Sequence, residues 1–180
     1  MPVEIRVATK NDLARITEIY GNSILTGTAS FETTPPNIDE MRQRFNKLVD
    51  GDYPYLVAEL DGQIAGYAYA GPYRARAAYY WSIEDAIYLD PQYHGRGIGK
   101  ALLLDLLEKC TKAGFRQMIG VIATDDKTPN LASIGLHEAC GFETIGNIKK
   151  IGRKHGIWLD TVIMQKSLGK GGTTPPPNEA

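Results

Sequence analysis

The stretch YHGRGIGKALL, residues 93–103, places three glycines directly before an apolar run with helical spacing. Glycine disfavours helix, and its missing Cβ lets a ligand come close to the backbone. The first turn of a helix leaves N–H groups without partners, and the helix dipole favours negative charge there. A strand, a glycine loop and a helix start in this order indicate an anion-binding loop rather than a plain turn.

Two common phosphate-binding motifs do not fit this loop. A Walker loop needs glycine where His94 stands, and Ser or Thr where Ala101 stands. A dinucleotide fingerprint needs GxGxxG after the opening strand of a parallel unit, whereas this chain has GxGxG after several predicted antiparallel strands. The remaining interpretation is a pyrophosphate held by backbone amides, on a molecule other than a nucleoside triphosphate or NAD.

Composition narrows the class of protein. The 180 residues are most simply one domain, which we place at residues 1–168. A formal net charge of −1 argues against a nucleic-acid partner that binds through bulk positive charge. No apolar run is long enough to span a bilayer, and the N-terminus lacks the apolar segment of a signal peptide, so we expect no membrane association.

The cysteines and histidines predict a cytoplasmic protein without a metal site. Cys110 and Cys140 lie far apart and form no CxxC motif, which fits a reducing compartment. The histidines at positions 94, 137 and 155 lack the spacing of metal ligands, so we expect no metal ion.

Hydrophobic spacing and turn residues predict strands and helices along most of the chain. Strands are expected at 4–8, 55–60, 63–71, 81–91, 116–123, 143–154 and 157–168. Helices are expected after a capping box at Thr9 and Asp12, after the cap Asn37, at 98–113 and at about 131–140. The pattern predicts an α/β (α+β) domain with a mixed, mostly antiparallel sheet flanked by helices.

The last twelve residues, GKGGTTPPPNEA at 169–180, differ in composition from the rest. Because this segment has almost no apolar side chains to bury, we expect a disordered tail.

Two segments together resemble a known enzyme family. IYLDPQYHGRGIGKALL, residues 87–103, resembles the acetyl-CoA pyrophosphate loop of the GNAT N-acetyltransferases, whose core is Gln/Arg-x-x-Gly-x-Gly/Ala. Gly97 and Gly99 occupy the glycine positions, and His94 stands in place of Gln or Arg. NLASIGLHEACGF, residues 130–142, resembles the family's Asn…Ala…Tyr…Gly-Phe stretch, with His137 where many members carry tyrosine. The likeness covers about residues 3–168 and implies the GNAT fold.

A narrower resemblance is to the phosphinothricin and methionine sulfoximine acetyltransferase subgroup. It rests on TASFETTPPN at 28–37, YAGPYRARAAYYWSIEDAIYLDP at 69–91 and IGRKHGIWLDTVIMQ at 151–165. It implies N-acetylation of small glutamate-like amino acids, such as phosphinothricin, methionine sulfoximine or methionine sulfone, by direct transfer in a ternary complex. One departure is the link IATDDKTPNLAS before Asn130, which is longer than usual.

The family resemblance implies where acetyl-CoA binds. The pantetheine would pair with the strand backbone at Ile87, Tyr88 and Leu89, as an added strand does, and one N–H there would polarise the acetyl carbonyl. The pyrophosphate and its surroundings would involve Gly95, Arg96, Gly97, Ile98, Gly99, Lys100 and Asn130. Arg96 and Lys100 are either anion ligands or solvated surface cations.

Acetyl transfer to an amine needs a base, because an α-amino group with a pKa of about 8 is mostly protonated at pH 7. Glu84 lies inside the apolar strand WSIEDAIYL, on the same face as Ser82 and Ala86, and we expect it to be that base. Either Glu84 or its neighbour Asp85 faces solvent if the strand has one polar face. His137 either donates a proton to the leaving thiolate, helps to order the base, or is an ordinary packed histidine.

The acceptor site is expected to bind an anionic or zwitterionic amino acid. Arg74 and Arg76 flank a loop rich in aromatic residues, and a guanidinium matches a carboxylate with two hydrogen bonds. Phe31 either covers this pocket or is ordinary packing. The subgroup resemblance adds Glu84, Asp85 and Ala86, and Lys154 and Trp158 are weaker candidates.

Two alternatives remain open at this point. One is a GNAT enzyme for another amine, such as a polyamine, an aminoglycoside or a protein N-terminus, although a cationic acceptor would need an acidic pocket. The other is a non-catalytic acyl-CoA-binding module, which the presence of Glu84 and His137 disfavours. The subgroup resemblance also implies a homodimer, formed near the apolar side chains of Ile151, Ile157 and Trp158.

Overall fold

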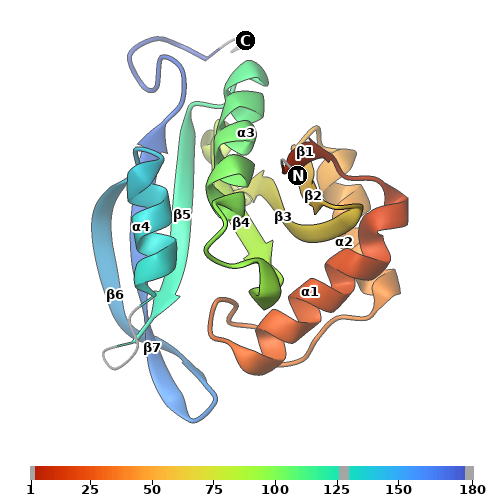
Figure 1. Cartoon of the computed structure of the whole chain (residues 1–180). Helices are drawn as coiled ribbons and strands as arrows, with labels where there is room; N and C mark the ends of the chain where they lie inside the picture. The colour runs from red at the N-terminus through yellow and green to blue at the C-terminus, as the bar shows by residue number, and fades with distance from the viewer. Residues whose placement is uncertain (1–2, 126–129, 177–180) are drawn as a thin grey trace.

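The computed structural model describes residues 3–125 and 130–176. Within these residues one sheet has the strand order β1-β2-β3-β4-β5-β7-β6 (Figure 1). The strands are β1 Glu4–Val7, β2 Tyr55–Leu60, β3 Gln63–Pro72, β4 Ser82–Leu89, β5 Gln117–Thr124, β6 Glu143–Lys154 and β7 Ile157–Ser167. The helices are α1 Leu13–Thr26, α2 Ile38–Val49, α3 Ile98–Lys112 and α4 Leu131–Ala139, with short 3₁₀ turns η1 Lys10–Asp12, η2 Ala77–Tyr79 and η3 Pro91–Tyr93.

The sheet is mostly antiparallel, as predicted, with one parallel joint between β4 and β5. This joint pairs only residues 82–84 with residues 117–119. Both strands continue well past the joint, to Leu89 and Thr124. The sheet therefore opens between the carboxyl-terminal halves of β4 and β5.

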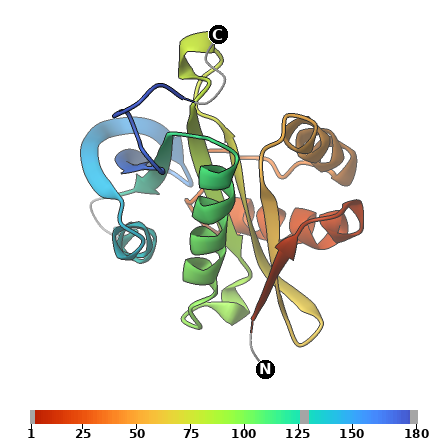
Figure 2. The same cartoon turned by 90° about the horizontal axis from the view of Figure 1, so that it is seen from above.

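Helices cover both faces of the sheet and enclose two separate cores (Figure 2). The leucines of α3 at 102, 103, 106 and 107 are buried on one face, as their spacing predicts. α1 and α2 bury Ile16, Ile24 and Phe45 on the other face. Along β4 the side chains alternate, so that Ile83 and Ile87 belong to the α3 side and Tyr88 to the α1 side.

Local signals in the sequence explain where the first helices begin. The side chain of Asn37 accepts a hydrogen bond from the N–H of Glu40 at 2.9 Å, as an N-cap does. The capping box of Thr9 and Asp12 is also formed, but the residues that follow Thr9 form the 3₁₀ turn η1. α1 begins directly after this turn, at Leu13. Asp12 is held in place by Arg6 of β1, whose guanidinium donates to both of its carboxylate oxygens at 2.9 Å.

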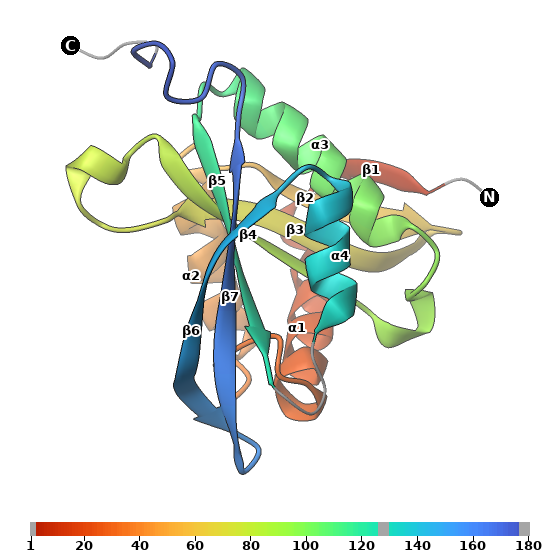
Figure 3. The ribbon, with the colours of Figure 1, turned by 90° about the vertical axis from the view of Figure 1, so that its left-hand side faces the viewer.

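The β6–β7 hairpin lies beside the segment that follows α1 (Figure 3). His155 Nε2 lies 3.2 Å from the carbonyl oxygen of Gly27, and Lys154 Nζ donates to the carbonyl oxygen of Ser30 at 2.7 Å. Figure 3 also shows that the connection between β3 and β4 projects away from the sheet. The segment after α1 lies at the opening between β4 and β5, where Ala29, Ser30 and Phe31 line a cavity, whereas the β3–β4 connection leads into the end of β4 that is paired with β5.

The end of the chain differs from the disordered tail expected at 169–180. Residues 169–176 form turns, in which the N–H of Gly171 bonds to the carbonyl oxygen of Leu168 at 2.8 Å. Arg116 also donates to the carbonyl oxygen of Pro175 at 2.7 Å. Gly169 and Gly171 both have positive φ, which lets the chain turn back without apolar burial. Residues 177–180 lie outside the described part.

Candidate active site

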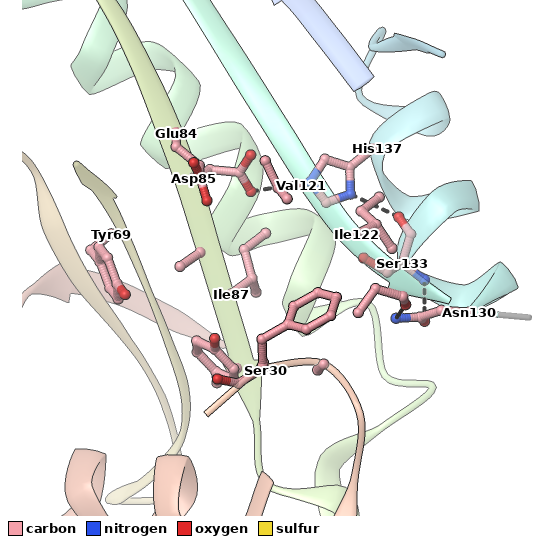
Figure 4. Close-up of a pocket in the computed structure, with 15 residues that line it drawn as sticks. Ser30, Tyr69, Glu84, Asp85, Ile87, Val121, Ile122, Asn130, Ser133 and His137 are labelled. Carbon is pink, nitrogen blue, oxygen red and sulfur yellow. Dashed lines mark hydrogen bonds and ion pairs between the residues drawn. The ribbon is translucent and has the colours of Figure 1, made fainter. Parts of the chain in front are cut away.

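A cavity of about 220 Å³ occupies the opening between β4 and β5 (Figure 4). We call it the reaction cavity. Its walls come from β4, β5, α4 and the segment after α1, and the lining residues are Ala29, Ser30, Phe31, Tyr69, Glu84, Asp85, Ala86, Ile87, Tyr88, Val121, Ile122, Ala123, Asn130, Ser133 and His137.

A second cavity, of about 700 Å³, lies between the end of α1, the glycine loop and α4. We call it the glycine-loop cavity. It contains eight of the residues predicted to bind acetyl-CoA, namely Ile87, Tyr88, Leu89, Gly95, Gly97, Gly99, Lys100 and Asn130. His94, which stands at the family's Gln/Arg position, lines it too.

The glycines of this loop have the backbone geometry of an anion site. Gly95 and Gly97 have φ of +73° and +76°, and a Cβ at either residue would meet no protein atom within 4 Å. Gly97 is the N-cap of α3 and offers no side chain to its N–H groups. These N–H groups therefore depend on a ligand or solvent for partners, and the helix dipole favours an anion there.

Two predicted cofactor residues do not line this cavity with their side chains. The guanidinium of Arg96 lies over the ring of Tyr93, 5.6 Å from its centroid. The side chain of Ile98 is buried in the core beneath α3. Only the backbone of these two residues is in a position to serve a ligand at the loop.

A third cavity, of about 320 Å³, lies between α2 and the strands β3 and β4. We call it the α2 cavity. It is lined by Arg44, Lys47, Leu48, Tyr69, Gly71, Pro72, Glu84, Asp85 and Ala86. Four of these residues, including Tyr69 and Glu84, also line the reaction cavity, which in turn shares Ile87, Tyr88 and Asn130 with the glycine-loop cavity. The three cavities therefore form a series with the reaction cavity in the middle.

Glu84 lies where the reaction cavity and the α2 cavity meet. Burial raises the pKa of Glu84 to about 7, with a further increase from the charge of Asp85 and an opposing effect of Arg74. A carboxylate with a pKa near neutral pH is suited to accept a proton from an ammonium group. The predicted position of Glu84 in its strand and the raised pKa of its carboxyl group are therefore both compatible with the role of a general base.

Asp85 points to the opposite face of the sheet from Glu84, toward α4 (Figure 4). Its Oδ2 lies 3.1 Å from His137 Nε2, and His137 Nδ1 lies 2.7 Å from the carbonyl oxygen of Ser133. Both side chains are almost completely buried. Burial lowers the pKa of His137, but the hydrogen bond and charge of Asp85 outweigh it and raise that pKa above its usual value. The sequence placed Asp85 among the acceptor contacts, whereas its carboxylate is occupied by His137.

The two predicted acceptor arginines are both exposed, and neither lines any of the three cavities. The charge of Arg74 lowers the pKa of Glu84, so its guanidinium is within electrostatic range of the site. It also lies over the ring of Tyr73, 5.1 Å from the centroid. Arg76, in the segment that projects from the sheet (Figure 3), is not among the charges that shift the pKa of Glu84.

Phe31 covers the reaction cavity and packs against the β6–β7 hairpin. A Cβ at Gly152 would come within 2.1 Å of its ring, so the hairpin needs glycine there. Lys154 is only 3% exposed, and its amine fixes Ser30, next to Phe31. Burial lowers the pKa of this amine. Trp158, the other weak candidate, is exposed and lines none of the cavities.

Several lining residues were not predicted from the sequence. Tyr69 could have been noticed, because it follows Tyr67 by two positions and so shares its face of the strand. Arg44 and Lys47 are charged residues in the amphipathic pattern of α2, and this pattern does not indicate that they face a ligand. Within the described residues no cluster of three or more His, Cys, Asp or Glu side chains has the arrangement of a metal site, and no helix is long and apolar enough to cross a membrane.

Comparison with known proteins identifies the family. Residues 22–142 match the family model described as the acetyltransferase (GNAT) family. The chain is a GNAT acetyltransferase. This confirms both the family and the fold that the glycine loop and residues 130–142 predicted.

The acetyltransferase has similar relatives over nearly its whole length. It is 48% identical over 172 residues, 96% of this chain and 86% of the relative, to a phosphinothricin N-acetyltransferase of Alcaligenes faecalis. It is 33% identical over 164 residues, 91% of this chain and 94% of the relative, to an L-methionine sulfoximine/L-methionine sulfone acetyltransferase of Salmonella typhimurium.

A solved structure has the same fold as this acetyltransferase. It is a phosphinothricin acetyltransferase of Sinorhizobium meliloti in complex with AcCoA, with a TM-score of 0.94 and 48% sequence identity. The match covers 100% of this chain and 96% of the other. The subgroup resemblance is thus supported by both sequence and structure.

Proposed function

We propose that this acetyltransferase moves the acetyl group of acetyl-CoA to the α-amino group of small glutamate-like amino acids, such as phosphinothricin, methionine sulfoximine and methionine sulfone. The observation that carries the proposal is Glu84, a carboxylate with a pKa of about 7, at the junction between the reaction cavity and a cavity lined by cations. The names of the similar enzymes from Alcaligenes and Salmonella support the same acceptor class.

Acetyl-CoA enters through the glycine-loop cavity in this proposal. The backbone N–H groups at 95–100 hold the pyrophosphate, and Lys100 adds positive charge. The pantetheine lies along residues 87–89, whose backbone on the β5 side is outside the parallel joint. Asn130 closes the other side of the same cavity, and a strand N–H polarises the acetyl carbonyl.

The acceptor enters from the α2 cavity, so the two substrates meet from opposite ends. Glu84 takes the proton of the ammonium group, and the neutral amine attacks the thioester carbon to form a C–N bond. The C–S bond then breaks, the nitrogen releases its extra proton, and the thiolate of CoA takes up a proton as it leaves. A covalent acyl-enzyme on cysteine is disfavoured, because burial raises the pKa of Cys110 to about 12 and also raises that of Cys140. Direct transfer in a ternary complex is the mechanism that this arrangement supports.

The charges near Glu84 favour an acceptor with acidic groups. Arg44 and Lys47 line the α2 cavity, and Arg74 is within electrostatic range of Glu84. Arg44 already forms ion pairs with Glu32 and Glu40, whereas no ion pair of Lys47 occurs among the described residues. These cations attract the carboxylate and the distal acidic or oxygen-rich group of the proposed substrates, and they repel polyamines.

A panel of amines tests the substrate class. With acetyl-CoA present, methionine sulfone, methionine sulfoximine and phosphinothricin are expected to release free thiol at least tenfold faster than spermidine, an aminoglycoside or a peptide N-terminus. Mass spectrometry should find one acetyl group on the α-amine. Faster turnover of a polyamine would overturn the acceptor class, and binding of acetyl-CoA without turnover of any amine would favour the non-catalytic module.

We also propose a homodimer formed by the β6–β7 hairpin. β6 is the last strand of the sheet, and Ile145, Ile148, Ile151 and Trp158 expose large apolar surface on this hairpin. Such a row on an edge strand is typical of a surface that pairs with another chain. A cytoplasmic location stays a prediction from the sequence.

Light scattering at micromolar concentration tests the dimer. The wild-type protein is expected to have about twice the 19.8 kDa mass of one chain. Ile151→Lys should shift the mass toward the monomer, whereas Leu104→Lys, at an exposed apolar residue of α3, should leave it unchanged. A monomeric wild-type protein would contradict the proposal.

A further inference from the structure

We propose that Asp85 is a positioning residue of the transfer reaction, which holds His137 as a doubly protonated imidazolium at the wall of the reaction cavity and acts through its charge on Glu84, its neighbour in β4. The kinetic half of this inference rests on the function proposed above. The protonation of His137 does not, because it is measured without turnover.

The protonation of His137 follows from its two partners. Nδ1 lies 2.7 Å from a backbone carbonyl oxygen, that of Ser133, which accepts hydrogen bonds only, so Nδ1 carries a proton. Nε2 lies 3.1 Å from Oδ2 of Asp85. An ionised carboxylate also only accepts, so Nε2 must donate as well. Both ring nitrogens then carry protons, and the ring is a cation opposite its counter-charge.

The surroundings of the pair leave it in one arrangement. The exposed fractions of the two side chains are 5% for His137 and 2% for Asp85. Phe142 packs edge-on against the imidazole, with 4.9 Å between ring centroids. Gly120 of β5 makes room for the contact, because a Cβ there would lie 2.9 Å from the Cδ2 atom of His137. The ring is therefore fixed by β5, by Phe142 and by its two hydrogen bonds.

With both nitrogens engaged, His137 is not free to act as a base. Of the roles expected from the sequence, the geometry favours the one in which it orders the site. Nor is Asp85 a side-chain contact of the acceptor, because its carboxylate lies on the opposite face of β4 from Glu84 and the α1–α2 core. The link from the pair to the reaction is electrostatic.

The charge of Asp85 reaches Glu84 through one peptide unit. Oδ1 of Asp85 has no hydrogen-bond partner among the described residues, so only Oδ2 of this carboxylate is in contact with His137. That charge adds to the effect of burial in raising the pKa of Glu84. Burial and a carboxylate on the far side of its own strand thus together raise the pKa of this base to near neutral pH.

The other titratable groups around the two carboxylates do not replace this effect. Asp85 also faces the thiols of Cys110 and Cys140, both of which have raised pKa values and stay neutral near pH 7. Around Glu84 are the cations Arg74, Arg44 and Lys47 and the hydroxyl of Tyr69, whose pKa is raised by burial. Asp85 is the one negatively charged group among these neighbours of Glu84 in the described part of the chain.

The first test is NMR of protein labelled with ¹⁵N-histidine, without substrates. In the wild-type protein the nitrogen shifts of His137 should stay those of an imidazolium to a higher pH than the shifts of a free histidine. In Asp85→Asn they should be those of a neutral ring at pH 8, with one protonated nitrogen. A neutral His137 in the wild type would overturn the proposal.

The second test is the pH dependence of kcat/KM. In Asp85→Asn the midpoint of the acid limb, near pH 7 in the wild type, should move to lower pH, because Glu84 loses the negative charge of its neighbour in the chain, whereas the positive charge lost from His137 lies on another element, α4. The double variant Asp85→Asn/His137→Asn should have the same midpoint as Asp85→Asn, since a neutral ring contributes no charge.

A matched control is Glu138→Gln, which neutralises an exposed carboxylate next to His137 on the same helix. It should leave the midpoint in place. A loss of kcat in Asp85→Asn with the wild-type midpoint would mean a purely structural role and would overturn the kinetic half. If no amine is turned over at all, the proposed function fails, while the NMR result still decides the state of His137.

Discussion

Glu84→Gln is expected to lower kcat by about 10²–10⁴-fold at pH 7, because glutamine keeps the volume of the side chain but cannot accept the proton of the amine. The wild-type kcat/KM should fall about tenfold per pH unit below the pKa of Glu84, which burial raises to about 7. That limb should disappear in the variant. Higher pH should partly restore its rate, since more of the acceptor then arrives as the neutral amine.

Two observations separate this role from its alternative. If Glu84 only binds the ammonium group, the substitution should raise KM and leave kcat largely intact. The affinity for acetyl-CoA, measured by calorimetry, should stay near the wild-type value, because Glu84 does not line the glycine-loop cavity. A kcat near the wild-type value at neutral pH would rule out Glu84 as the base.

Gly97→Ala is expected to weaken acetyl-CoA binding at least tenfold, which corresponds to about 1.4 kcal/mol or more. The backbone at Gly97 faces a cavity, and the new Cβ would occupy the space where the pyrophosphate approaches the N–H groups. Its φ of +76° also costs the variant stability, by about 1–2 kcal/mol for a residue with a Cβ. Calorimetry and denaturant unfolding measure these two effects separately.

The chain offers a control with the same backbone strain. Gly62, in the β2–β3 turn, has φ of +75°, and a Cβ there also meets no protein atom within 4 Å. Gly62→Ala should therefore lose a similar amount of stability and bind acetyl-CoA normally. Equal acetyl-CoA affinity in the two folded variants would show that the loop at 95–99 does not hold the pyrophosphate.

The features that could be predicted from the sequence are those whose residues lie close together in the chain. The glycine loop and the helix after it are neighbours in the chain, so residues 93–103 contain both the anion site and its dipole. The cap at Asn37 is likewise local. These elements keep their geometry whatever packs against them, which is why motif and spacing were enough.

The direction of Asp85 could have been inferred in part. Strand alternation places it on the same face as Ile83 and Ile87, and an acidic residue on an apolar face requires a buried partner. The partner is His137, which is 52 positions further along. Only the packing of α4 across β5 brings the two together, and no local pattern encodes that packing.

Other parts of the site depend on how a helix or a loop is oriented relative to the sheet, which no local sequence pattern specifies. α2 was predicted, but the tilt that places Arg44 and Lys47 over Glu84 results from how its apolar side packs on β2. Arg76 was expected at the acceptor because, like Arg74, it flanks a loop rich in aromatic residues and its guanidinium could bind a carboxylate. The turn η2 and its flanking residues instead carry it away from the sheet.

Different parts of the chain line the two ends of the series of three cavities. The end toward the glycine loop is built from the end of α1, the glycine loop, α3, α4 and the last residues of β4, whereas the end toward α2 is built from α2, β3 and the middle of β4. Only β4 contributes to both ends. A gene that diverges in the codons for α2 and β3 can therefore acquire a different acceptor while its cofactor end stays intact. The same separation lets an engineer randomise Arg44, Lys47, Tyr69 and Pro72, which line the α2 cavity, without changing any residue of the cofactor end.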